Sequence, residues 1–190
     1  SRDNGIGNLE FLSCIPGSIG GAIIMNSGCY GYEISKFLVS INVIDIKDCK
    51  EKEIKREQIK FFYRGTNLPS EFIIVSAKLK GIKISKEDIQ KKQNELIERK
   101  KISQPSQIKT CGSTFKNLNN EKKAWQLIKE TGCDDFKEGD AVISKKHCNF
   151  FINEGGAKSA DIEKLINRVK KTVNDKTGVN LELEIKIIGE

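Results

Sequence analysis

Hydrophobic residues along the chain follow two spacings, and the first of them predicts strands. Residues 37–46 are rich in β-branched side chains with partial alternation of apolar and polar positions, and residues 72–84 have the same character. Both stretches are therefore predicted to be strands. The segment between them at residues 48–56 is mostly charged and is predicted to be a turn region. A compact apolar run at residues 147–152 predicts a further strand.

The clearest alternation lies near the end of the chain, at residues 181–187. Apolar side chains occupy every odd position, while Glu182, Glu184 and Lys186 occupy the even positions. A period of two places these sets on opposite faces of a strand. Glu184 is then a carboxylate on the polar face, which has a chemical role only if that face lines a cleft.

The second spacing, with apolar residues three or four positions apart, predicts three helices. Ser85 and Asp88 form a capping box before a helix that runs to about Lys101. Its circumference is mostly charged, so it is predicted to connect two modules. Residues 124–128 predict a short helix stopped by Gly132, and the third helix begins with Ser159 as N-cap and ends before Gly178.

These elements predict an α+β protein with a domain boundary at the connecting helix. The expected domains are residues 1–85, residues 86–180 with the connector at 86–101, and a returning strand at 181–190 that carries Glu184. The chain has 190 residues, enough for one large or two small domains with real cores.

Composition narrows the class of protein further. With 37% hydrophobic and 31% charged residues, and no apolar run near about 18 residues, the chain is expected to be globular, cytoplasmic and not inserted in a membrane. The formal net charge is +7, but lysine and arginine are interleaved with glutamate, which favours a solvated surface over nucleic-acid binding. Six widely separated cysteines without Cys/His spacing suited to zinc predict reduced thiols and no metal site.

Residues 15–31 form a glycine-rich run that is a candidate for binding a phosphate or a cofactor. Glycine is placed where the backbone needs a positive φ or direct contact with another group, and ordinary tight turns use the same property. The spacing is neither that of a Rossmann turn nor that of a P-loop. The candidate positions are Pro16, Gly17, Ser18, Gly20, Gly21, Ala22, Asn26 and Gly28.

Two side chains elsewhere carry possible chemistry. Arg64 follows Tyr63 and precedes a turn, so it can pair with a carboxylate or phosphate through two hydrogen bonds, or simply stack on the tyrosine. Ser113 follows Gly112 at the start of a predicted strand and can donate a proton or act as a turn residue. His147 is the single histidine and is expected to be structural, which argues against a Ser-His-Asp triad.

Five motifs in one order resemble the UDP-N-acetylenolpyruvoylglucosamine reductase family, in its shorter second type. The matching segments are residues 15–22 with 26–28, residues 63–66, residues 104–105 with 112–117, residues 144–150, and residues 181–185. This family makes UDP-N-acetylmuramate for bacterial peptidoglycan. The resemblance extends over essentially the whole chain.

The resemblance implies a flavoenzyme mechanism. NADPH reduces a bound FAD, which then delivers hydride to the enolpyruvyl group of a UDP-sugar. Arg64 is expected to pair with the substrate carboxylate, Glu184 to polarise the same group, and Ser113 to protonate the carbon that becomes negative. Lys116 and Asn117 are expected to contact substrate, and the glycine-rich run to hold the flavin pyrophosphate through backbone N–H groups.

The same resemblance implies the fold and a departure from it. Residues 1–85 are expected to be the second half of a vanillyl-alcohol-oxidase-type FAD-binding domain, followed by a small α+β substrate-binding domain. The family's N-terminal flavin-binding lobe is missing, so these residues alone are expected to be inactive. A flavin-dependent oxidase with another substrate and a basic nucleic-acid-binding module stay open as alternatives, and the oligomeric state is not indicated.

Overall fold

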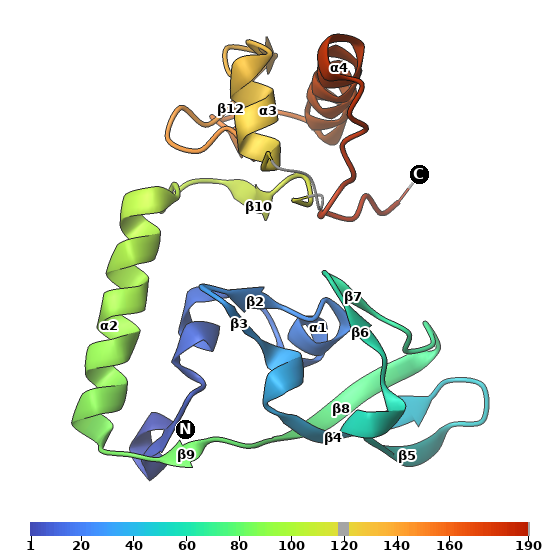
Figure 1. Ribbon diagram of the computed structural model, residues 1–190. Helices are drawn as coiled ribbons and strands as arrows, with labels where there is room; N and C mark the ends of the chain where they lie inside the picture. The colour runs from blue at the N-terminus through green and yellow to red at the C-terminus, as the bar shows by residue number, and fades with distance from the viewer. Residues whose placement is uncertain (118–121, 190) are drawn as a thin grey trace. The chain divides into compact units, whose positions relative to one another are not determined.

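The computed structural model describes residues 1–117 and 122–189 and divides into two compact units, Ser1–Lys100 and Lys101–Glu190 (Figure 1). Helices and strands occur in both units, so the predicted α+β class is confirmed. Each unit encloses hydrophobic clusters of its own. The two units are therefore described separately.

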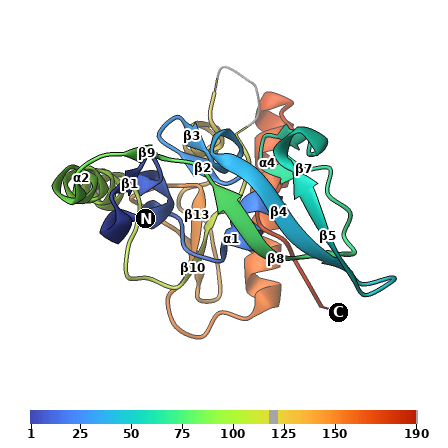
Figure 2. The ribbon, with the colours of Figure 1, turned by 90° about the horizontal axis from the view of Figure 1, so that it is seen from below.

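A three-stranded antiparallel sheet forms the centre of the first unit, with β4 (Leu38–Asp45) between β5 (Lys50–Lys55) and β8 (Phe72–Leu79) (Figure 2). Helix α1 (Ile19–Ile24) packs against β8. Strand β4 supplies half of the buried apolar residues of this core, namely Leu38, Ile41 and Val43. The fully or nearly buried members of this core are Ile23, Ile34, Leu38, Ile41, Val43 and Ile59.

Strand β5 shows that the prediction of a turn at residues 48–56 is wrong. It pairs with β4 without interruption from Ser40↔Lys55 to Asp45↔Lys50. The sequence lacks a strand signal because β5 is an edge strand whose side chains mostly face water, and charged side chains are common at such edges. Only the residues between Asp45 and Lys50 form the turn, with Cys49 at a positive φ of 53°.

The strand predicted at residues 72–84 is divided by a loop into β8 and β9 (Ile82–Lys83). Strand β9 leaves the central sheet and pairs with β1 (Ile6–Gly7). Gly81 permits this close approach, because a Cβ at its position would lie 2.4 Å from the carbonyl oxygen of Gly7.

Two small hairpins complete the first unit. Strand β2 (Gly28–Cys29) pairs with β3 (Tyr32–Glu33), and β6 (Phe61–Phe62) pairs with β7 (Gly65–Thr66). Short 3-10 turns connect these pieces, namely η1 (Arg2–Asn4), η2 (Glu10–Cys14), η3 (Ile34–Lys36) and η4 (Arg56–Gln58). The hairpins matter for function because they carry Gly28 and Arg64.

The long helix α2 (Lys86–Ser103) confirms the prediction of a helix that starts after Ser85. The Ser85 hydroxyl accepts a hydrogen bond from the Asp88 backbone N–H at 3.0 Å, as a capping residue does. Although most of α2 is charged, Ile89 and Leu96 are buried, and Leu96 shares a cluster with Phe11. These contacts attach the helix as far as Lys100 to the first unit.

The second unit is built on a four-stranded antiparallel sheet in the order β10-β13-β12-β11. These strands are β10 (Thr110–Ser113), β11 (Lys137–Glu138), β12 (Ala141–Ile143) and β13 (Phe150–Asn153). The helices α3 (Ala124–Glu130) and α4 (Ser159–Thr177) pack against each other, and α4 covers β11 and β12 (Figure 1). Leu165, Ile166, Val169 and Val173 of α4 fill the core.

Three boundaries in the second unit differ from the sequence prediction. Residues 147–149 precede β13 as a turn, because their backbone reverses direction before Phe150. Ser159 is the first residue of α4, and the N-cap position belongs to Lys158, whose N–H donates to Asp161 at 2.9 Å. Residues 181–187 make one β-bridge, Phe115↔Leu183, instead of a continuous strand. Gly178 ends α4 with a φ of 72°, as predicted.

Candidate functional site

The glycine-rich run folds as a loop that leads into α1. Ser18 is the N-cap of α1, and its hydroxyl accepts a hydrogen bond from the Gly21 N–H at 3.1 Å. Gly17 has a φ of 124°, which residues with a side chain rarely adopt, and nothing lies within 4 Å of the place where its Cβ would be. The structure therefore brings Pro16, Gly17, Ser18, Gly20, Gly21 and Ala22 together around one open stretch of backbone.

Gly28 serves a different purpose from Gly17. A Cβ at this position would lie 2.1 Å from the carbonyl oxygen of Tyr32, so only glycine permits the β2–β3 pairing. Gly17 and Gly31 thus have a positive φ and open space at the place of a Cβ, whereas Gly20 and Gly21 lie in α1 and Gly28 permits strand pairing.

Asn26 is a buried polar residue that joins three segments of the first unit. Its Nδ2 donates to Glu33 Oε2 and to the Phe62 carbonyl oxygen, both at 3.1 Å, and its Oδ1 accepts from the Ser35 N–H at 3.4 Å. Asn26 is 2% exposed and has a φ of 41°. Its side chain is thus used to hold the β6–β7 hairpin beside the glycine-rich run.

Arg64 lies in the turn of that hairpin. Its φ of 56° is in the left-handed region, which is unfavourable for a side chain of this size. The Arg64 Nη2 donates to the Gly28 carbonyl oxygen at 3.3 Å, and the guanidinium lies 4.8 Å from the centre of the Tyr63 ring. The predicted stacking on Tyr63 is therefore present, and Arg64 and Gly28 lie close together although they are far apart in the sequence.

Further cations surround the glycine-rich run. Lys36 Nζ donates to the Gly31 carbonyl oxygen at 3.2 Å, and Lys100 Nζ donates to that of Cys14. Arg99 lies over the Tyr30 ring at 4.5 Å. Together with Arg64, these groups make the neighbourhood of the loop electropositive, which favours an anionic ligand.

The thiol next to this loop is not a nucleophile. Burial and the neighbouring Cys14 thiol raise the pKa of Cys29 to about 11. A thiol with this pKa stays protonated at neutral pH, and the thiolate is the reactive form.

In the second unit, Ser113 ends β10 at a place where the regular pairing with β13 shifts register. Gly112 precedes it with a φ of 86° and open space around the place of its Cβ. Ser113 is half-buried, whereas Thr114 beside it is buried. The backbone at Ser113 is thus accessible from one side and anchored on the other.

The segment that carries Glu184 lies directly beside the segment that carries Ser113. The Glu184 N–H donates to the Thr114 carbonyl oxygen at 2.9 Å, and the Lys116 N–H donates to that of Glu182 at 2.8 Å. With the bridge between Phe115 and Leu183, these bonds form a short antiparallel pair. The structure therefore brings two predicted site residues from opposite ends of the second unit into one region.

The two predicted substrate contacts are engaged within the second unit. Lys116 Nζ lies 3.4 Å from Glu182 Oε2, and Asn117 Oδ1 accepts from the Ala124 N–H at 3.2 Å. Asn117 thereby satisfies a backbone donor at the start of α3, which links the segment after Ser113 to that helix.

Asn149 is the residue of this region to which sequence reasoning assigned no role. It is 2% exposed, and its amide makes two hydrogen bonds to the backbone of Phe115. The signal for it is weak because asparagine before an apolar strand usually marks a turn. His147 nearby packs against the Phe150 ring at 4.9 Å and the Trp125 ring at 6.3 Å, and burial lowers its pKa.

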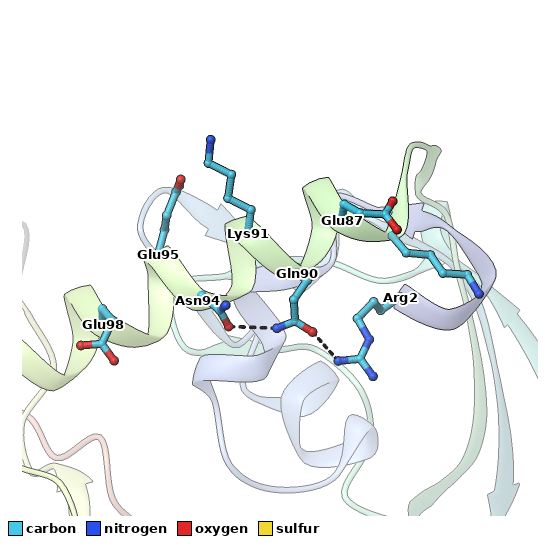
Figure 3. A pocket seen from close by; sticks show the side chains of 8 residues that line it. Arg2, Glu87, Gln90, Lys91, Asn94, Glu95 and Glu98 are labelled. Atoms are coloured by element: carbon cyan, nitrogen blue, oxygen red, sulfur yellow. Dashed lines mark hydrogen bonds between the residues drawn. The ribbon is translucent and has the colours of Figure 1, made fainter.

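A groove along α2 is a second candidate surface, shown in Figure 3. The side chains that line it are Arg2, Lys86, Glu87, Gln90, Lys91, Asn94, Glu95 and Glu98. Gln90 accepts from Arg2 at 2.6 Å and donates to Asn94 at 2.9 Å. Because charges of both signs alternate there and its amides bond to each other, the groove does not present one convergent chemistry, and none of the predicted site residues lines it.

Within residues 1–117 and 122–189, no group of three or more histidine, cysteine, aspartate or glutamate side chains is arranged to hold a metal ion. None of the helices in these same ranges has both the length and the apolar character that a membrane crossing requires.

Comparison with known proteins finds similarity to one family. Residues 104–188 match the family model described as UDP-N-acetylenolpyruvoylglucosamine reductase, C-terminal domain. The chain is 47% identical over 188 residues to the UDP-N-acetylenolpyruvoylglucosamine reductase of Pelagibacter ubique and 45% identical over 184 residues to that of Wolbachia pipientis wMel. These matches cover 98% and 97% of this chain, and the chain spans 62% of the length of each relative.

A solved structure gives the same result. The crystal structure of UDP-N-acetylenolpyruvylglucosamine reductase from Thermus caldophilus superposes with a TM-score of 0.85 at 33% sequence identity. The match covers 97% of this chain and 65% of that one.

Proposed function

Since the chain belongs to the UDP-N-acetylenolpyruvoylglucosamine reductase family, we propose that it supplies the substrate-reducing machinery of such an enzyme. The proposed reaction is the NADPH-dependent reduction of UDP-N-acetylglucosamine enolpyruvate to UDP-N-acetylmuramate through bound FAD, in the bacterial cytoplasm. The product is a precursor of peptidoglycan. Because the chain spans 62% of its relatives' length, this activity is a proposal about these residues within a longer catalytic unit.

The observation that carries the proposal is the hydrogen bond from the Glu184 N–H to the Thr114 carbonyl oxygen. This bond joins the backbone of Glu184 to the segment that contains Ser113, although nothing in the local sequence predicts the contact. Reduction of an enolpyruvyl group needs both a proton donor and groups that stabilise a developing enolate. Ser113 and Glu184 are residue types suited to these two tasks.

In the proposed mechanism, Ser113 donates a proton to the substrate carbon that becomes negative. The serine hydroxyl is a weak acid, so the resulting alkoxide needs electrostatic support. Lys116 lies three residues after Ser113 in the sequence, and its ammonium group also forms an ion pair with Glu182. Glu184 is proposed to polarise the enolpyruvyl carboxyl group, and Asn117 and Lys116 to contact the UDP-sugar.

Arg64 is proposed to bind the enolpyruvyl carboxylate. Its bond to the Gly28 carbonyl oxygen and its contact with the Tyr63 ring limit the motion of the guanidinium, so less conformational freedom is lost when an anion binds. A fixed cation that meets a growing negative charge lowers a reaction barrier more than one that has to reorganise.

The first unit offers a loop that fits an FAD pyrophosphate. Gly17 leaves its backbone open, and the cations Lys36, Arg64 and Lys100 bond to the carbonyl oxygens of Gly31, Gly28 and Cys14, toward the two ends of the glycine-rich run. The backbone N–H groups from Gly17 to Gly20 would hold the pyrophosphate, with Pro16, Gly21 and Ala22 forming the adjoining backbone and Asn26 and Gly28 shaping the wall beside it. When bound, the flavin supplies the hydride that NADPH provides.

The test compares two proteins. One is the 190-residue chain, and the other is an extended chain that carries the N-terminal lobe of the Pelagibacter ubique relative. We expect tight FAD binding and reduction of UDP-N-acetylglucosamine enolpyruvate only for the extended chain. Tight FAD binding and turnover by the 190 residues alone would contradict the expected need for the lobe.

Ser113→Ala in the extended chain tests the assignment of the proton donor. We expect kcat to fall by on the order of 100- to 10,000-fold while FAD remains bound. The matched control is Ser159→Ala, since Ser159 is an exposed serine of the same unit at the start of α4, and this change is expected to leave kcat within about twofold. An extended chain that binds FAD but oxidises an alcohol instead would support the flavin oxidase alternative.

A further inference from the structure

Asn149 contacts the segment that joins the two proposed catalytic residues of the second unit. Its Oδ1 accepts from the Phe115 N–H at 2.9 Å, and its Nδ2 donates to the Phe115 carbonyl oxygen at 2.8 Å. Its own carbonyl oxygen accepts from the Thr114 N–H at 2.8 Å. Three hydrogen bonds thus connect this one residue to two successive residues that follow Ser113.

These bonds replace strand pairing where it fails. After a shift of register, β10 pairs with β13 up to Ser113↔Phe150, where β10 ends and β13 begins, so the ladder does not extend to Phe115. The amide of Asn149 presents one acceptor and one donor, which is the same pair of groups that a neighbouring strand would offer. Phe115 is fully buried, and its backbone groups need such partners.

The opposite edge of the same segment holds Glu184. Thr114 accepts from the Glu184 N–H, and Phe115 forms the bridge with Leu183. The segment from Thr114 to Lys116 therefore lies between Asn149 on one edge and the C-terminal segment on the other. A shift of this segment moves Ser113 and Glu184 in relation to each other.

We propose that Asn149 is a positioning residue that sets the placement of Ser113 relative to Glu184 for proton donation. This inference rests on the proposed function. A displacement of roughly 1 Å at a reacting group costs on the order of 100-fold in rate, so loss of the Asn149 bonds acts mainly on kcat. Binding of the UDP-sugar through Lys116 and Asn117 is expected to change less, because these residues keep their own hydrogen bonds to the Glu182 carbonyl oxygen and the Ala124 N–H.

Asn149→Asp in the extended chain tests this in a way that a purely structural role does not imitate. The ionised carboxylate can accept from the Phe115 N–H but cannot donate to its carbonyl oxygen. The protonated carboxylic acid can do both, so it restores the pattern of the amide. Burial raises the pKa of such a carboxyl group, which brings the change into an accessible pH range.

Other titratable groups lie near position 149 and contribute their own pH dependence to kcat. They are His147 and Cys148 on the same segment, Lys116 beside Phe115, and Glu182 and Glu184 on the C-terminal segment. Every variant retains them, so their titration is removed by dividing each kcat by that of the unsubstituted extended chain at the same pH.

We expect kcat of Asn149→Asp to be lower by about 10- to 100-fold at pH 8.5 and to recover to within about threefold near pH 6. The KM for the UDP-sugar is expected to change by less than about threefold. Asn149→Leu is expected to show the same deficit at both pH values. A deficit of Asn149→Asp that is independent of pH, or a change confined to KM, would overturn the proposal.

Asn153→Asp is the matched control. Asn153 is the last residue of β13, the strand that follows Asn149, and it also bonds to backbone: its Nδ2 donates to the Ala157 carbonyl oxygen at 3.1 Å, and its Oδ1 accepts from the N–H groups of Gly155 and Ala157. It holds a loop without a proposed catalytic residue. Its kcat is expected to stay within about twofold at every pH, and a pH-dependent deficit like that of Asn149→Asp would overturn the inference.

Amide hydrogen exchange separates failure of this inference from failure of the proposed function. In the 190-residue chain, which needs no turnover for this measurement, Asn149→Asp is expected to speed exchange at Phe115 and Glu184 at pH 8.5 more than at pH 6, after correction for intrinsic exchange rates. Unchanged protection would refute the positioning role by itself. If Asn149→Asp shows the expected pH-dependent exchange but the extended chain does not reduce the UDP-sugar, the proposed function is refuted instead.

Discussion

Asn26 in the first unit and Asn149 in the second unit invite direct comparison. Both are 2% exposed, and both hold backbone next to a proposed catalytic residue. Asn149 bonds with its side chain to the two backbone groups of one residue, Phe115. Asn26 instead bonds to three separate residues and adopts a positive φ of 41°.

The difference shows that the same residue type is required for two physical reasons. At position 149 the amide replaces a missing strand partner, and the backbone makes no special demand. At position 26 the backbone itself favours asparagine or glycine, because few other residues tolerate the left-handed region. Substitution by glycine and by alanine therefore affects the two sites in opposite order.

The largest expected effect is that of Asn26→Ala. It removes three hydrogen bonds and leaves the Ser35 N–H and the Glu33 carboxylate without these partners, and alanine is strained at this φ. We expect a loss of about 3–4 kcal/mol in the unfolding free energy of the first unit, and a loss about 1 kcal/mol smaller for Asn26→Gly. Urea unfolding followed by hydrogen exchange of first-unit amides measures it.

At Asn149 the order is expected to reverse. Asn149→Ala removes two side-chain bonds and costs about 2–3 kcal/mol, and Asn149→Gly costs about 0.5–1 kcal/mol more because glycine loses more backbone freedom on folding. Trp125 is the single tryptophan and lies in the second unit, so its fluorescence reports this unfolding. The same order at both positions would remove the distinction between them.

Arg64 extends the comparison to backbone strain at a proposed catalytic residue. Its φ of 56° predicts that Arg64→Gly is more stable than Arg64→Ala by about 1 kcal/mol, although both lose the bond to Gly28 and the proposed substrate contact. Thermal unfolding of the two variants measures the difference. Equal stabilities would show that the turn does not store strain at this residue.

A smaller effect concerns pH and the aromatic cluster of the second unit. Burial lowers the pKa of His147 in the folded protein, whereas the unfolded chain has the ordinary value of about 6.5. As the pH falls below about 6.5, the unfolded chain therefore binds the proton more readily than the folded chain. Stability of the second unit is therefore expected to decrease as pH falls from about 7 toward 5. His147→Phe should reduce that slope in Trp125-detected urea unfolding, and an unchanged slope would assign the pH dependence to other groups.

The smallest effect is expected from the exposed pair Lys116–Glu182, whose charged atoms lie 3.4 Å apart. Glu182→Gln should change the unfolding free energy by less than about 0.5 kcal/mol, because exposed ion pairs gain little. The backbone bond between the same two residues should persist. A change above about 1 kcal/mol would mean that the side chains, and not the backbone, hold this pair together.

Much of the local structure was predictable because it depends on neighbouring residues. The three helices follow from their apolar spacing, and Gly178 ends α4 as expected. The edge strand β5 was missed because its stability comes from pairing with β4 and not from burial of its own side chains. A full strand was predicted at residues 181–187, where the structure has one bridge at Leu183. Alternation of apolar and polar residues shows which face of a strand each side chain occupies, but it does not show how many of the residues have a pairing partner.

The distance between residues along the chain also explains which parts of the candidate site could be predicted from the sequence. The amino-acid sequence by itself determined the α+β class, the helices α2, α3 and α4, and the motif order by which Arg64, Ser113 and Glu184 were selected, since local spacing and residue chemistry are read directly from it. It did not indicate α1, which lies within the glycine-rich run. Only the tertiary structure decided that Glu184 pairs with Thr114 and that Asn26 and Asn149 hold the proposed catalytic segments. Such bonds join residues distant along the chain, and they form only after the fold has brought a buried amide to backbone groups that lack another partner.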